Sequence, residues 1–199
     1  MKPANGLLPG FSDPVPDSQR TFRTIMNAMA HPGRIYELSS VLKVPAPLYS
    51  TTAAVCLTLL DLDTPLWVDS FGSPSEILNY LKFHCGCPLS KDSAEAAFAI
   101  VTDGRSVPSL SSFQCGDPLY PERSTTAIIQ VESLRNSPEV RLKGPGIKTE
   151  MSLQAAGLNQ DFWLDFRANS GKFPLGVDVL LVSPESICGL PRTVKVARS

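Results

Sequence analysis

The stretch "TTAIIQVESL", residues 125–134, is apolar and rich in β-branched side chains for several positions in a row. Two more stretches of this kind, "AAFAIVT" and "GVDVLLVS", occupy residues 96–102 and 176–183. Strands with one face in water alternate apolar and polar residues, whereas strands covered on both faces are continuously apolar. The three stretches therefore predict central strands of a sheet with other layers packed on both of its faces.

Segments with helical spacing alternate with these strands. The clearest is "SQRTFRTIMNAMA", which has apolar residues at positions 22, 25, 26 and 29, begins after Asp17 or Ser18 as N-cap, and ends at His31-Pro32-Gly33. Further helices are expected within residues 50–60, whose hydroxyls could cap the first turn, and within residues 73–85 and 156–169. Short strands are expected at "RIYEL" and "LWVDS", on either side of a "DLDTP" turn region. The pattern predicts an α/β fold, a layered mixed sheet flanked by helices.

The length of 199 residues fits one domain with a hydrophobic core. We expect residues 1–17, which are punctuated by Pro and Gly, to form a flexible N-terminal arm and residues 18–199 to form a single α/β domain. Hydrophobic residues make up 43% of the chain and charged residues 19%, as in ordinary globular proteins. The formal net charge of -1 provides no overall field that would attract nucleic acid or an anionic membrane.

Other composition features bear on location. No stretch reaches the roughly 20 apolar residues of a membrane helix, and the first residues lack the apolar run of a signal peptide. Five cysteines, an odd number, are typical of reduced thiols more than of a disulfide framework. We therefore expect a cytoplasmic protein.

The segment "RLKGPGIKTE", residues 141–150, has glycines before a Lys-Thr pair and invites comparison with a phosphate-binding loop. A P-loop needs glycine directly before the Lys-Thr pair and again five positions earlier, where this chain has Ile147 and Leu142. Pro145 also removes a backbone amide from the loop. The segment favours a tight turn after a strand, with a residual hypothesis that its cations contact an anion.

The remaining chemistry-bearing residues form no established motif. "FHCGCPL" places His84, Cys85 and Cys87 within four residues, which is too close to complete a tetrahedral metal site easily, so a packed helix end is favoured and no metal is expected. Asp63 belongs to an Asp-x-Asp pair of the kind that builds turns. Arg23 and Arg192 are candidate anion ligands because a guanidinium offers a planar fork of donors. No residue is predicted to be catalytic.

Six segments, taken in order and at similar spacing, resemble the PhnH subunit family of the bacterial carbon-phosphorus lyase system. They run from about residue 18 to residue 196 and are "TFRTIMNAMAHPG", "LTLLDLDTPLWV", "LKFHCGCPL", "RLKGPGI", "FPLGVDVLLV" and "LPRTV". The resemblance supplies the candidate ligand or interface residues Arg23, Asp63, His84, Gly144, Gly146, Asp178 and Arg192. Cys85 and Cys87 depart from the family pattern, which weakens a metal site further and leaves redox sensitivity open.

The resemblance implies a non-radical subunit that assembles with PhnG-, PhnI- and PhnJ-like subunits. In that pathway a phosphonate displaces the adenine of a nucleoside triphosphate to give a ribose 1-phosphonate 5-triphosphate, and a different, iron-sulfur radical subunit later breaks the carbon-phosphorus bond. The resemblance also implies a homodimer when the chain is isolated, and a fold like that of pyridoxal-phosphate-dependent transferases without the cofactor. Exposed loops around residues 61–65, 141–148 and 189–193 are the expected contact segments.

A second hypothesis is a self-standing binder or enzyme. It would act on a phosphorylated small molecule in a transferase-like cleft, and its ligands would come from Arg23, His84, Asp178 or Arg192.

Overall fold

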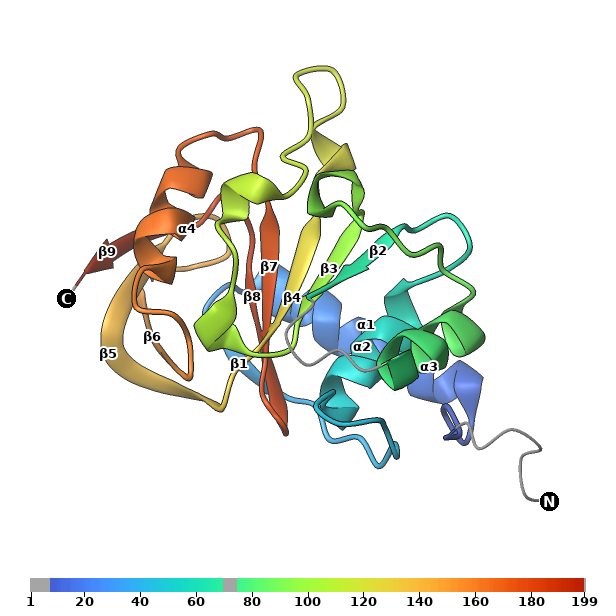
Figure 1. The fold of residues 1–199 in the computed structure, drawn as a ribbon. Helices are drawn as coiled ribbons and strands as arrows, with labels where there is room; N and C mark the ends of the chain where they lie inside the picture. The colour runs from blue at the N-terminus through green and yellow to red at the C-terminus, as the bar shows by residue number, and fades with distance from the viewer. Residues whose placement is uncertain (1–7, 70–74, 199) are drawn as a thin grey trace.

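The computed structural model describes residues 8–69 and 75–198, and a six-stranded mixed sheet lies at its centre (Figure 1). The strand order is β1-β8-β7-β4-β3-β2. Four neighbouring strands are parallel: β2 (Leu66–Val68), β3 (Phe98–Val101), β4 (Thr126–Gln130) and β7 (Asp178–Val182). The antiparallel strands β8 (Ser186–Leu190) and β1 (Ile35–Glu37) extend the sheet beyond β7. The prediction of a mixed sheet flanked by helices is confirmed.

The continuously apolar strands are buried on both faces, as predicted. Side chains of one set, including Ile100, Ile128 and Leu180, pack against α1 (Pro14–Ala30), α2 (Ser50–Leu59) and α3 (Ser75–Cys85). Their neighbours along each strand, including Ile129 and Leu181, face the opposite core, which contains α4 (Phe162–Ser170). Figure 1 shows α1, α2 and α3 gathered together and α4 on the other side of the sheet.

The helix bounds differ from the sequence prediction at two places. Helix α1 begins at Pro14, four residues before the predicted start, because proline is suited to a first helical turn and the Asp13 N–H donates to Asp17 Oδ2 at 3.1 Å. Residues 14–17 of the expected arm are therefore helical, and residues 1–7 lie outside the described residues. Helix α2 has Tyr49 as N-cap with no side-chain cap, so the predicted hydroxyl cap is wrong.

One of the hydroxyls at the start of α2 has another partner. Thr51 Oγ1 donates to the Ser183 carbonyl at 2.7 Å, which ties the start of α2 to the end of β7. Among the described helices, none is long and apolar enough to cross a membrane.

A second, three-stranded antiparallel sheet follows β4, in the order β6-β5-β9. Its strands are β5 (Ser133–Lys143), β6 (Met151–Ala156) and β9 (Lys195–Arg198). The predicted strand 125–134 thus ends at Gln130, and its last two residues belong to β5. The segment 141–150 contains the turn of the β5–β6 hairpin, as the sequence predicted, with Gly144 and Gly146 at positive φ.

Candidate functional site

Arg192 and Asp178, two of the predicted site residues, meet at the amino end of β7. The Arg192 Nη2 atom lies 2.5 Å from Asp178 Oδ2, and the backbone N–H of Arg192 donates to Asp178 Oδ1 at 2.8 Å. Arg192 Nη1 donates to the carbonyls of Pro121 and Pro174, at 2.8 and 3.4 Å, and Nη2 also donates to Ser124 Oγ. The side chains of the ion pair are only 13% and 19% exposed. We call this group of residues the arginine node.

The arginine node is a structural clamp. A guanidinium has five N–H donors, and here its three nitrogens all donate to groups of the same chain. An external anion would have to displace Asp178 or a carbonyl from these donors. The anionic partner of Arg192, which the sequence left open, is therefore Asp178 of the same chain. The contacts join the β8–β9 connection to residues before β4 and β7.

The two glycines of the 141–150 segment are required by close packing. Gly146 has a φ of +81°, and a Cβ there would lie 2.2 Å from the Ala30 carbonyl oxygen at the end of α1. A Cβ on Gly144 would lie 3.1 Å from the Thr193 carbonyl oxygen. The hairpin turn therefore sits against both the end of α1 and the β8–β9 connection, which brings two of the expected contact segments, 141–148 and 189–193, together.

The cations of this hairpin are partly neutralised within it. Arg141 Nη1 lies 3.4 Å from Glu150 Oε1, and Lys143 Nζ lies 3.7 Å from Glu150 Oε2. Both pairs are about half exposed, so each contributes little to stability. Glu150 competes for the two cations that the residual anion hypothesis would need.

The other predicted residues lie on separate elements. His84 Nε2 is 2.9 Å from the Leu8 carbonyl oxygen, so this ring anchors the N-terminal segment to α3. Asp63 is exposed in the turn after α2, where its N–H donates to Asp61 Oδ1 at 3.0 Å. Arg23 is exposed on α1. Within the described residues, no group of three His, Cys, Asp or Glu side chains is placed to hold a metal ion.

A buried polar network at the opposite ends of the parallel strands was missed by sequence reasoning. Asp69 follows β2, and its carboxylate accepts bonds from the Thr102 N–H and Oγ1, both at 2.9 Å. Gln130 Nε2 donates to the Thr102 carbonyl at 2.9 Å and to the Pro47 carbonyl at 3.0 Å, while its Oε1 accepts from the Tyr49 N–H at 2.7 Å. We call this group the carboxyl-end network.

The carboxyl-end network holds Asp69 in an unfavourable setting for a charge. Burial raises the pKa of Asp69 above its usual 3.8, and the hydrogen bonds from Thr102 offset only part of this effect. Polar groups at the carboxyl ends of parallel strands are where α/β proteins commonly bind ligands. One signal was present in the sequence, because Asp69, Thr102 and Gln130 each end an apolar run.

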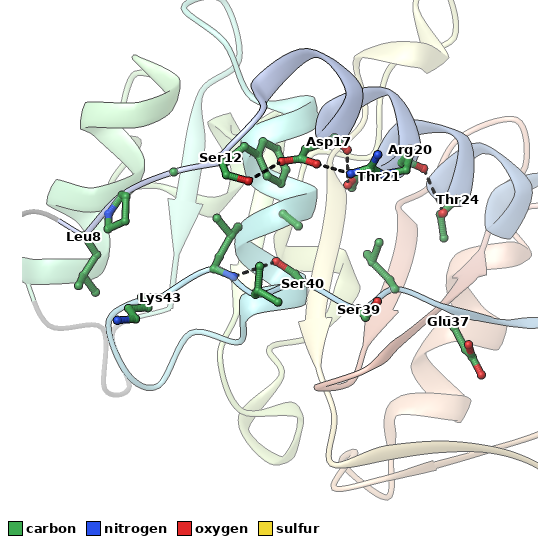
Figure 2. Close-up of a pocket in the computed structure, with 17 residues that line it drawn as sticks. Leu8, Ser12, Asp17, Arg20, Thr21, Thr24, Glu37, Ser39, Ser40 and Lys43 are labelled. Carbon is green, nitrogen blue, oxygen red and sulfur yellow. Dashed lines mark hydrogen bonds and ion pairs between the residues drawn. The ribbon is translucent and has the colours of Figure 1, made fainter.

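A groove of about 1010 Å³ lies between α1 and the segment that follows β1. Residues 8–12, the first half of α1 and residues 37–43 line it, together with Ala54 of α2 (Figure 2). Its cations are Lys43 and Arg20, and Arg20 pairs with Asp17 within the groove. Thr21 and Thr24 direct their hydroxyls to carbonyls of their own helix, at 2.9 and 3.1 Å.

The outer face of α1 carries an apolar stripe made of Val15, Phe22 and Met26, which are 79%, 46% and 53% exposed. Steps of seven and four residues keep the three side chains within an arc of about 40°. The buried face consists of Thr21, Ile25 and Ala28. The helical periodicity in the sequence did not distinguish the two faces, since it grouped residues 22 and 26 with Ile25.

Helix α1 and strand β8 approach closely at Ala28. A Cβ added to Gly189 would lie 2.5 Å from the Ala28 carbonyl oxygen. The position of Gly189 therefore needs glycine, and the small Ala28 faces it from the helix.

These features define an α/β domain whose predicted site residues largely hold its own loops together, and which exposes an apolar helix face. The chain matches the family model described as "Bacterial phosphonate metabolism protein (PhnH)" over residues 9–197. The chain belongs to the PhnH family.

Two relatives match along most of their length. The first, from Rhizobium meliloti (strain 1021), is named alpha-D-ribose 1-methylphosphonate 5-triphosphate synthase subunit PhnH; it is 39% identical over 189 residues, which cover 94% of each chain. The second, from Stutzerimonas stutzeri, is HtxG, named provisionally as a C-P lyase subunit protein; it is 31% identical over 185 residues, which cover 91% of this chain and 86% of the relative.

Proposed function

We propose that this chain is a non-radical subunit of a carbon-phosphorus lyase core complex in organic phosphonate catabolism. In this role it supports the formation of a ribose 1-phosphonate 5-triphosphate from a nucleoside triphosphate and a phosphonate. The observation that carries the proposal is the match, at 39% identity over 94% of both chains, to a relative named as a synthase subunit. Arg192 and Asp178 bind one another, which argues against these two residues as ligands of a small molecule.

The apolar stripe on α1 is the docking surface that we propose. A folded chain gains nothing by exposing Phe22 and Met26 to water. Burying their apolar surface against a partner would stabilise a complex by about 25 cal/mol for each Å² removed from water. The hairpin turn around Gly146 packs on Ala30, the last residue of the same helix. The partners of the apolar stripe would be PhnG-, PhnI- or PhnJ-like subunits in the cytoplasm, and a second copy when the chain is isolated.

The test is co-expression of the tagged chain with its PhnG-, PhnI- and PhnJ-like partners, followed by mass measurement of the purified assembly. We expect a stoichiometric complex. The double variant Phe22→Ser/Met26→Ser should lose the partners, whereas Leu119→Ser, which removes a still more exposed apolar side chain from a loop, should retain them. Recovery of the unmodified chain alone would contradict the subunit role, and a full complex with the double variant would place the interface elsewhere.

The finer structural expectation is a fold like that of pyridoxal-phosphate-dependent transferases, without the cofactor. The parallel strands β2, β3, β4 and β7 with helices on both faces support it. An experimental structure compared with such transferases is the direct check.

A second candidate function, binding of a phosphorylated small molecule, is favoured by the groove beside α1. Its volume of about 1010 Å³ is sufficient for a nucleotide-sized ligand, and Lys43 and Arg20 supply cations. Calorimetric titration of the isolated chain with ATP and methylphosphonate tests this function. Saturable binding that Lys43→Gln weakens would support it, and heats indistinguishable from buffer would exclude both ligands.

A further inference from the structure

The outer face of the three-stranded sheet carries a concentration of cations. In β5, Arg141 and Lys143 are exposed and alternate with buried residues. In β9, Lys195 is exposed between two buried valines. The buried residues of both strands pack in the core that contains α4, so the three cations lie on the face turned away from that core. We call Arg141, Lys143 and Lys195 the basic face.

Two of these cations are direct neighbours across the sheet. Lys143 and Lys195 are cross-strand partners in the β5–β9 register. Such partners share one face with Cβ atoms about 4.5 to 5.5 Å apart, and like charges in this position destabilise a sheet. The folded chain therefore retains an unfavourable pair, which an anionic partner would relieve.

The chain neutralises the basic face only in part. Glu150 lies 3.4 Å from Arg141 Nη1 and 3.7 Å from Lys143 Nζ, so one carboxylate serves two cations. Among the ion pairs formed within residues 8–69 and 75–198, none includes Lys195. The positive charge in excess is local, because the whole chain has a formal net charge of -1. It attracts an anionic group to this face and not to the molecule in general.

The backbone that carries the cations is held in place on both sides. Strand β5 pairs with β6 and with β9, and the Ile147 N–H donates to the Gly144 carbonyl at 3.1 Å within the hairpin turn. Gly144 also packs against the Thr193 carbonyl, just before β9. A partner that binds here therefore orders side chains without having to order the backbone, which lowers the entropic cost of binding.

The shape of the basic face selects the kind of partner. The side chains of Arg141 and Lys143 are 50% and 61% exposed on a sheet surface, and the groove beside α1 includes no residue of the basic face. Sites for small molecules are concave and bury most of the ligand, whereas protein interfaces form on extended surfaces. A small anion would remain largely hydrated at this face, and the overall charge does not favour nucleic acid.

We propose that the basic face is an interaction surface for an acidic segment of a partner protein. Carboxylates of such a segment would lie between Lys143 and Lys195 and replace their repulsion with attraction. The inference rests on the proposed subunit role for the identity of the partner, and it adds the chemistry of the surface that the partner presents.

The experiment titrates the isolated full chain into fluorescein-labelled poly-L-glutamate and measures fluorescence anisotropy. We expect saturable binding that weakens about tenfold between roughly 50 and 200 mM sodium chloride, because salt screens exposed charges. Lys195→Glu should weaken binding about tenfold at the lower salt concentration. Glu150→Gln, which removes the competing carboxylate, should strengthen it about threefold.

Lys91→Glu is the matched control because it makes the same charge change at another exposed lysine. Lys91 follows the segment that pairs with β2, at the opposite side of the molecule from the three-stranded sheet (Figure 1). This variant should bind poly-L-glutamate as the unmodified chain does. Lys195→Glu should also raise the urea midpoint, since it places a carboxylate opposite Lys143, so its weaker binding is not a result of unfolding.

Several outcomes would overturn the proposal. These are no binding at low salt, equal affinities for Lys195→Glu and Lys91→Glu, and a lower urea midpoint for Lys195→Glu. Displacement of poly-L-glutamate by sodium tripolyphosphate or duplex DNA at a far lower concentration of charge would assign the face to phosphate groups instead. Assembly in co-expression without peptide binding would overturn the basic face and leave the subunit role intact. Peptide binding without assembly would support the basic face and contradict the subunit role.

Discussion

The two ends of the parallel strands bury a carboxylate in different ways. At the amino end, Asp178 is paired with Arg192 and lies 2.5 Å from its guanidinium. At the carboxyl end, Asp69 receives hydrogen bonds from the neutral N–H and hydroxyl of Thr102. A buried charge needs a partner of opposite charge or a raised pKa. At the amino end, Asp178 forms an ion pair that joins loops. At the carboxyl end, burial raises the pKa of Asp69.

This difference separates structural support from a potential for chemistry. The arginine node uses its donors within the chain, so an external ligand would have to displace them. The carboxyl-end network holds a carboxyl group that titrates above its usual pKa, at the edge where α/β folds commonly bind ligands. Substitutions at the two ends should therefore produce different kinds of effect.

The largest expected effect is at Arg192. Arg192→Met leaves Asp178 buried without its cation and should lower the free energy of unfolding by about 3 to 5 kcal/mol, measured by urea denaturation. Arg192→Lys keeps the positive charge without the planar fork of donors. Its free energy of unfolding should lie between those of Arg192→Met and the unmodified chain. Arg105→Met, which breaks the exposed Arg105–Glu132 pair, should leave the midpoint nearly unchanged. A loss below about 1 kcal/mol for Arg192→Met would reduce the node to an ordinary surface pair.

A smaller loss is expected at Gln130, the centre of the carboxyl-end network. Gln130→Leu leaves the Tyr49 N–H and the carbonyls of Pro47 and Thr102 without this partner. Each buried group left unpaired costs about 1 to 3 kcal/mol, and relaxation toward water should hold the total near 3 kcal/mol. Gln114→Leu is the matched control because Gln114 is exposed. Equal denaturation midpoints for the two variants would show that the network does not support the fold.

The third prediction concerns pH at Asp69. Because the folded chain holds the Asp69 proton more tightly than the unfolded chain, the folded state binds more protons above pH 3.8, and stability falls as pH rises through this range. Asp69→Asn removes the titration and should flatten the pH dependence, by at most about 1.4 kcal/mol per pH unit. Urea denaturation at pH values from 3.8 to about 7 measures the slope. Parallel curves for the two proteins would contradict the raised pKa.

The main sheet was predictable because burial on both faces leaves continuous apolar runs, as in residues 125–130 and 178–182. Strand β5 was not predictable. Its pairing with β6 shifts register between Arg135 and Val140, and several consecutive exposed residues interrupt the alternation of buried and exposed positions that marks a strand. The residue types and the resemblance identified Arg192 and Asp178 separately. Their contact depends on the β7–β8 pairing, which local sequence does not encode.

The smallest effect on stability is expected on the outer face of α1. The stability change measured there is the reference for the changes expected at the two ends of the sheet. Phe22→Ser/Met26→Ser removes side chains that are 46% and 53% exposed, so the free energy of unfolding should change by about 0.5 kcal/mol or less. Ile25→Ala, one residue away on the buried face, should cost about 2 to 5 kcal/mol. Urea denaturation of both variants makes the comparison.

If the stripe serves assembly, the double variant should combine normal stability with loss of association, a pair of results that neither end of the sheet can give. Arg192→Met and Gln130→Leu would weaken a complex only by unfolding the chain. Strong destabilisation by the double variant would instead show that Phe22 and Met26 pack within the fold, and loss of partners in co-purification would then carry no information about an interface.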